Sequence, residues 1–175
     1  PVPDVVRNAV LAPVKVESQK LADGVWLLGG GSHNSVLVEF KDFVAVVEAP
    51  QNEARSLAVI EEIGRLVPNK LIRYVVNTHH HFDHTGGLRT YAAEGATIVT
   101  HASNVPYFEK TLVAPATVSP DAQSKAQKAP VFQPVTEKWE LTDGAQKIEV
   151  YATPGDIHTK EYTLLYLPVQ KVLVQ

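Results

Sequence analysis

The segment from Asn77 to Gly87 constrains the fold of this chain more than any other part of the sequence. It reads Asn-Thr-His-His-His-Phe-Asp-His-Thr-Gly-Gly, a dense cluster of histidine and aspartate. A strongly β-prone run at 71–76 precedes it, and a short helical pattern at 86–94, closed by Gly95, follows it. Loops at the carboxyl ends of strands are where α/β sheets place their functional sites. The fold therefore has to present this loop at the edge of a sheet.

The pattern on either side of that loop predicts an α/β layered sheet. A helix is expected over 51–66, because apolar residues recur every third position from Leu57 to Leu66, and Pro68 ends it. Strand, helix, strand, helix and strand alternate through the middle of the chain, which indicates helices packed on a sheet. Strands are expected at 14–21, 25–28, 35–40, 43–47, 71–76, 96–100, 139–141, 147–152, 162–167 and 171–175.

The chain has the size of one domain. Its length of 175 residues and its hydrophobic fraction of 45% allow a buried core. Residues 1–13 are proline-rich and are expected to form an extended N-terminal arm before a domain that spans 14–175. Residues 104–135 hold five prolines and a polar run, so we interpret them as a partly helical insertion near the site.

The amino-acid composition limits the kinds of metal site and of binding partner that this sequence predicts. The sequence has no cysteine, so disulfides and cysteine metal ligands are excluded. A metal site must then use histidine and carboxylate, which suits zinc or iron. The formal net charge of −3 argues against a nucleic-acid partner. No apolar run reaches the roughly 18 residues that a membrane-spanning helix needs.

The spacing within the histidine segment predicts metal binding. In an extended loop, side chains two positions apart point to the same side, so His79 and His81 can bind one ion while His80 points away. Asp83 and His84 follow one turn later and can face a second ion beside the first. Clustered imidazoles and carboxylates are costly unless a cation lies among them. These residues are therefore candidate metal ligands.

A tetrahedral metal needs a third protein ligand and an open position for water. His158 lies between two expected strands, in a turn that Pro154 and Gly155 would hold. His101 follows a strand end and fits a packing or capping role as well as a site role. His33 follows a run of glycines; it could line a pocket, but it fits a solvated loop residue better than a ligand.

The pattern His79-x-His81-x-Asp83-His84, followed by His158 in a Gly-x-x-His-Thr element, resembles the metallo-β-lactamase superfamily. The resemblance covers the chain from about residue 14 to its end. It implies an αββα sandwich with a metal site at one edge, between the two sheets. It also implies that His79, His81 and His158 hold a first metal ion, and that Asp83 and His84 contribute to a second.

Two features depart from the family pattern. Where the family has a stretch like Val-Asp-Thr-Gly, this chain has Val-Val-Glu-Ala-Pro, so Glu48 is expected to take the supporting role of the aspartate. The family also supplies an aspartate or cysteine after the strand that matches 172–175, and a histidine later. The chain given ends before both. We therefore expect a longer natural protein, in which residues beyond Gln175 complete the second metal site and the second half of the sandwich.

The resemblance implies a zinc-dependent hydrolase that uses a metal-bound hydroxide, with one or two zinc ions, or iron in their place. Asp83 would be both a metal ligand and the catalytic group that orients or deprotonates the water. The small-molecule substrates of the family are esters, thioesters, lactones, β-lactams and phosphodiesters, of which the last fit the acidic balance least. Phe82, Tyr107 and Phe108 could line the pocket, together with the loop around His33.

Two other functions remain open at this stage. Some relatives bind iron and act as persulfide dioxygenases, so an iron-dependent oxidoreductase is one alternative. The other is a metal-binding fragment without catalytic activity. The resemblance also implies a bacterial source and a periplasmic or secreted location, with a signal peptide absent from the sequence given. The oligomeric state is not set by any of these features.

Overall fold

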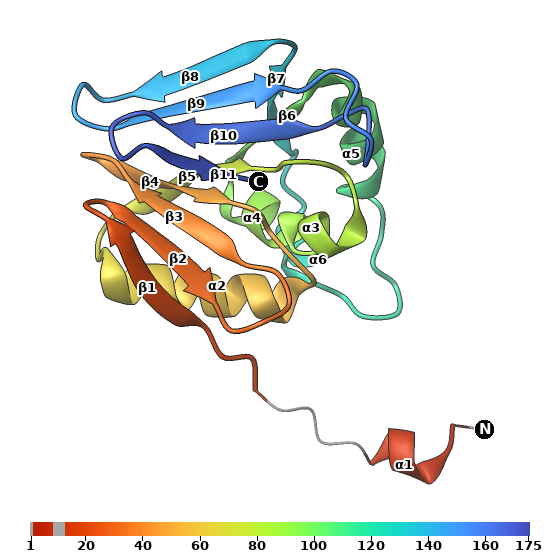
Figure 1. Cartoon of the computed structure of the whole chain (residues 1–175). Coiled ribbons are helices and arrows are strands. Elements are labelled where there is room, and N and C mark those ends of the chain that lie inside the picture. The colour runs from red at the N-terminus through yellow and green to blue at the C-terminus, as the bar shows by residue number, and fades with distance from the viewer. Residues whose placement is uncertain (1, 9–12) are drawn as a thin grey trace.

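The computed structural model describes residues 2–8 and 13–175 of the chain. Its body has three layers: helices, a large sheet and a small sheet (Figure 1). The N-terminal arm projects from the body and carries one helical turn, α1 (Asp4–Arg7). Residues 1 and 9–12 of that arm lie outside the described part of the chain.

The large sheet has seven strands in the order β1-β2-β3-β4-β5-β6-β7. The first four form an antiparallel meander, and β4 to β7 run parallel. Parallel neighbours need crossover connections, and these carry the helices. The strands are β1 (Glu17–Ala22), β2 (Val25–Gly29), β3 (Ser35–Glu39), β4 (Phe43–Val47), β5 (Leu71–Val76), β6 (Thr97–His101) and β7 (Val131–Val135).

The helices of the crossovers cover one face of the large sheet (Figure 1). The longest helix, at 53–66, begins after Asn52, whose side chain caps it. The helix at 88–94 ends before Gly95, which has the left-handed conformation. The elements are α2 (Glu53–Leu66), α3 (Phe82–Thr85), α4 (Leu88–Glu94), η1 (Ala102–Asn104), α5 (Val105–Thr111) and α6 (Ala122–Ala126).

The small sheet packs on the other face of the large one. It is antiparallel, in the order β11-β10-β9-β8. Its strands are β8 (Lys138–Thr142), β9 (Lys147–Ala152), β10 (Thr163–Leu167) and β11 (Val172–Val174). Figure 1 shows no helix over its outer face within the described residues. The structure thus confirms the α/β class and shows the helix, sheet and sheet layers of the expected αββα sandwich.

Two hydrophobic cores hold these layers together. Successive residues of a strand point to opposite faces, so Val46 packs toward the helices while Val47 packs toward the small sheet. The helix-side core includes Val59 and Ile63 of α2, and the core between the sheets includes Ile148 of β9. The histidine loop follows β5, a strand that has residues in both cores.

Two local expectations differ from the structure. Leu57, expected on the apolar face of the helix, is 48% exposed, whereas the neighbouring Ser56 is buried. The hydroxyl of Ser56 donates to the carbonyl of Gly87 at 3.3 Å, so the buried face of α2 includes Ser56 and leaves Leu57 beside it. Within the segment expected as an insertion, the residues 131–135 form β7, an edge strand of the large sheet, where Pro134 is tolerated. No helix among the described residues has both the length and the apolar character to cross a membrane.

Candidate metal centre

The histidine loop leaves the end of β5 at the seam between the two sheets. Buried Asn77 fixes its path: the side-chain amide donates to the carbonyl of His79 at 2.7 Å. The hydroxyl of Thr163, on the small sheet, donates to the carbonyl of Asn77 at 3.1 Å. The loop is therefore attached to both sheets before its first histidine is placed.

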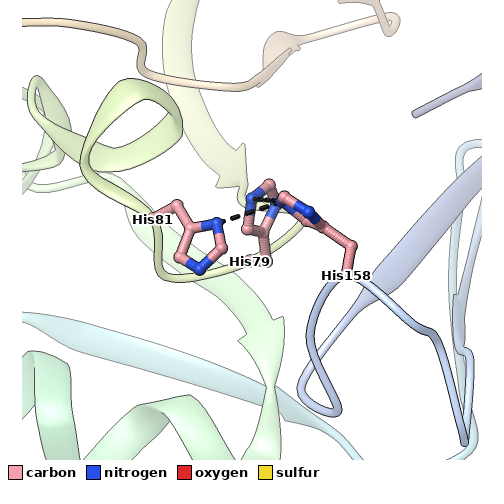
Figure 2. A group of neighbouring side chains, drawn as sticks. All are labelled: His79, His81 and His158. Carbon is pink, nitrogen blue, oxygen red and sulfur yellow. Dashed lines mark hydrogen bonds between the residues drawn. The ribbon is translucent and has the colours of Figure 1, made fainter.

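The first group of donors is His79, His81 and His158 (Figure 2). His79 and His81 come from the loop after β5, and His158 reaches across from the loop between β9 and β10. The Nε2 atom of His158 lies 3.0 Å from Nδ1 of His81 and 3.2 Å from Nε2 of His79. The structure thus brings together three side chains that are far apart in the sequence.

The spacing of these nitrogens fits a metal ion. A zinc ion bonded at about 2.0–2.1 Å in tetrahedral geometry holds its nitrogen ligands roughly 3.3 Å apart. Hydrogen bonding explains the cluster less well, because one ring nitrogen of His158 faces two others and can satisfy only one of them. The three residues could hold a metal ion, with one position left for water or substrate.

The surroundings keep His79 neutral, the form that binds metal. Burial and the neighbouring imidazoles lower the pKa of His79 to about 3. Its Nδ1 lies 2.9 Å from the hydroxyl of Thr78, which leaves Nε2 facing His158. Buried Tyr162 stacks on the ring at 5.0 Å between centroids. His79 is therefore held in position on its ring face and at one nitrogen.

The second group of donors is His33, Asp83 and His84. Asp83 and His84 lie on α3, and His33 lies on the loop between β2 and β3. The rings of His79 and His84 are 4.1 Å apart between centroids, so the two groups are adjacent. Desolvation by burial alone would raise the pKa of Asp83, but the backbone N–H of Asp83 and the neighbouring imidazoles lower it overall. Asp83 is thus a carboxylate at neutral pH.

Glu48, the residue that directly follows β4, supports the second group. Its carboxylate accepts a hydrogen bond from the backbone N–H of Thr78 at 2.7 Å and pairs with Nδ1 of His84. Burial alone would lower the pKa of His84, but the hydrogen bond and charge of Glu48 raise it overall. A proton on Nδ1 leaves Nε2 of His84 free, which is how carboxylates orient metal-binding histidines.

The backbone near Glu48 is strained, and the hydrogen bonds of Glu48 stabilise it. Glu48 and Gln51 have positive φ angles of 68° and 67°, unusual for residues with side chains. Such conformations persist where the surrounding structure over-determines them, often at functional sites. Gly86 and Gly87, which follow α3, pack closely against this part of the chain and against α2. A Cβ at Gly86 would overlap with the carbonyl of Gln51, and one at Gly87 with the hydroxyl of Ser56. Both glycines are therefore needed for this approach.

The remaining candidates from the sequence have other roles. His80 belongs to neither group; its ring lies edge-on to those of His81 and Tyr107, with 5.1 and 5.9 Å between ring centroids. His101 caps η1 by accepting from the N–H of Ser103 at 3.2 Å. Phe108 is buried in the helix-side core, so it packs and does not line a pocket. Phe82 is 73% exposed beside the histidines.

Sequence reasoning missed His33, which it placed as a solvated loop residue. In the structure its Nε2 lies 3.1 Å from a carboxylate oxygen of Asp83. The available signal was its position after the glycine run of a loop already expected to shape the pocket. A cavity of about 580 Å³ lies elsewhere, beneath the segment 112–129, and shares no residue with either group of donors.

Comparison with known families gives one clear match. A family model described as the metallo-beta-lactamase superfamily matches residues 28–174. A search of curated proteins gives no match.

Solved structures with the same fold include several metallo-beta-lactamases. The DIM-1 metallo-beta-lactamase is 21% identical, with a TM-score of 0.67 over 91% of this chain and 68% of its own. A metallo-beta-lactamase from Pontibacter korlensis is 20% identical, with a TM-score of 0.69 over 91% and 70%. A HARLDQ-motif mutant of the enzyme from Cronobacter sakazakii is 21% identical, with a TM-score of 0.66 over 89% and 59%. At these identities the likeness shows the fold alone.

Proposed function

The chain belongs to the metallo-beta-lactamase superfamily, and from that premise we propose that it is a zinc-dependent hydrolase of small molecules that carry an ester, thioester, lactone or β-lactam carbonyl. The observation that supports this most is the pair of adjacent donor groups at one edge of the two sheets. Zinc suits both, because it accepts imidazole and carboxylate ligands and tolerates an open position.

A divalent ion at such a site supplies a nucleophilic hydroxide at neutral pH and polarises the carbonyl. The chain supplies the arrangement around it. Ring nitrogens of His81 and His79 both face Nε2 of His158. Asp83, half exposed and ionised, orients the attacking water and accepts its proton.

Exposed apolar side chains flank the donors and favour substrates with an apolar group. Phe82 follows His81 and is 73% exposed, and Ile157 precedes His158 and is fully exposed. Tyr107, 49% exposed, lies against His80. Exposed apolar side chains beside the donors can take up the apolar part of a substrate while its carbonyl faces the donors. An anionic phosphodiester fits least well with a net charge of −3.

One observation favours an alternative. Two histidines and one carboxylate, as in His33, Asp83 and His84, form the donor set typical of non-haem iron(II) oxygenases. The second candidate function is therefore an iron-dependent oxidoreductase of the persulfide dioxygenase kind.

Assays of the metal-loaded protein decide between these functions. Zinc-loaded chain is incubated with an aryl ester, a thioester, a lactone and a chromogenic β-lactam, before and after chelation. We expect turnover of at least one class, loss of turnover on chelation, and recovery with zinc. Oxygen consumption with a persulfide, together with iron in the purified protein, would support the oxidoreductase instead. A metal-loaded protein inactive in every assay would be a binding fragment.

A further inference from the structure

We propose that His33 is the third protein ligand of a second metal ion, which it binds together with Asp83 and His84. This inference rests on the proposed function, because it takes the histidine loop to be a metal centre.

The three donors converge on a common point. One oxygen of Asp83 lies 3.1 Å from Nε2 of His33 and 3.9 Å from Nε2 of His84. The two imidazole rings meet edge to face, with centroids 5.0 Å apart. One ligand atom from each residue lies within 4.8 Å of the others. Each side chain therefore needs only a small movement to bind one ion.

A hydrogen-bond relay orients the ring of His33. The Nδ1 atom of His33 lies 2.9 Å from the hydroxyl of Ser32, which also accepts from the side-chain amide of Gln51 at 2.9 Å. A hydroxyl oxygen has two lone pairs, so Ser32 can accept from Gln51 and from a proton on Nδ1 together. In that tautomer Nε2 of His33 is unprotonated and faces Asp83. This is the outer-shell arrangement that metal-binding histidines use.

The loop that carries His33 is anchored at its start. Buried Arg55 donates to the carbonyls of Leu28 and Gly29, at 3.0 and 2.7 Å, and to that of Lys15 at 2.9 Å. Gly30 has a φ angle of 101° and lies so close to Lys15 that a Cβ would overlap with its carbonyl. The glycine loop is therefore fixed by a buried cation where it leaves the sheet, which holds His33 near α3.

An ion pair between His33 and Asp83 would explain their contact without a metal. It does not explain why His84 faces the same carboxylate oxygen, with its other nitrogen already held by Glu48. Two imidazoles directed at one carboxylate, each with its far nitrogen hydrogen-bonded, form an environment for a cation.

Zinc binding by a His33→Ala variant tests the proposal. Equilibrium dialysis against Zn²⁺, with zinc measured by elemental mass spectrometry, gives the stoichiometry and both affinities. The matched control is His101→Gln, which changes a histidine outside both groups. We expect the wild-type chain and the control to bind two zinc ions and His33→Ala to retain one tight ion. The second affinity should fall by more than the roughly 10–100-fold that loss of an outer-shell partner causes.

Each other outcome is decisive. Unchanged second-ion affinity in His33→Ala would overturn the role of His33 and leave the proposed function intact. A wild-type chain that binds one ion, unaffected by the variant, would do the same. A wild-type chain that binds no zinc would remove the proposed function itself. Circular dichroism confirms that the variants fold, and His33→Gln, which keeps a polar side chain, repeats the test if His33→Ala does not.

Discussion

The two donor groups lie side by side but are built differently. The first, His79, His81 and His158, has nitrogens 3.0–3.2 Å apart and includes one fully buried ring. The loop that carries His79 is hydrogen-bonded to strands of both sheets, whereas His158 is exposed on its own loop. The second is more open: the side chain of Asp83 is 51% exposed, and His33 comes from a glycine loop. Its geometry depends on Glu48, Ser32 and Gln51. We call the first the preorganised group and the second the supported group. The two should differ in their affinity for metal and in their sensitivity to changes in the residues around them.

Removal of metal breaks both groups at once and should have the largest effect. A chelator is expected to abolish hydrolysis and lower the melting temperature. Zinc at 100 times its Kd stabilises a folded protein by about 2.7 kcal/mol, which corresponds to roughly 5–10 °C for a chain of this size. Calorimetry with and without zinc measures the shift. Identical melting curves would contradict metal binding by the folded state.

Substitution of His158 should remove the preorganised group alone. In His158→Ala, the tighter zinc affinity is expected to disappear and hydrolysis to fall to the level of the chelated protein, because two imidazoles remain of three. Lys160→Ala, on the same loop, is the control. Zinc dialysis and the ester assay measure the two effects. A variant that keeps its tight ion would show that His158 is not a ligand.

Substitution of Glu48 should weaken only the supported group. Glu48→Gln retains size and an acceptor for the N–H of Thr78 but removes the charge that fixes the proton on His84. We expect the weaker zinc affinity to fall about 10–100-fold while the tighter one stays unchanged. Glu61→Gln, an exposed carboxylate on α2, controls for the loss of a charge. A fall in both affinities would mean that the two groups are not separate in the way described.

Loss of the Ser32 hydroxyl should have the smallest effect. Ser32→Ala removes one neutral hydrogen bond to His33, which contributes about 1 kcal/mol and hence roughly fivefold in affinity. The weaker zinc affinity is expected to change by about that factor, against a control of Ser103→Ala. No change in the dialysis isotherm would show that the relay from Gln51 does not orient His33.

The same contrast separates what the sequence could predict from what it could not. The strands β4, β5 and β9 were predicted to their ends, because β-branched runs bounded by turns leave little choice. His79 and His81 followed from the spacing of a single loop. His158 required the family resemblance, since spacing alone left three histidines open.

The features that escaped prediction depend on tertiary contacts. His33 is placed by a glycine loop whose course depends on Arg55, a buried cation 22 positions later in the sequence. A run of glycines predicts only backbone flexibility, so no local sequence feature indicated the course of the loop. Leu57 was misplaced for a similar reason, because the buried face of α2 includes Ser56, which contacts Gly87 from a distant part of the sequence.

Anomalous diffraction from crystals of the zinc-loaded chain, at the zinc absorption edge, tests the central claim most directly. The account predicts two peaks, one among His79, His81 and His158 and the other among His33, Asp83 and His84. A single peak at the first group, with His33 turned away from Asp83, would contradict the second site. Peaks elsewhere, with both groups empty, would contradict the metal centre as a whole.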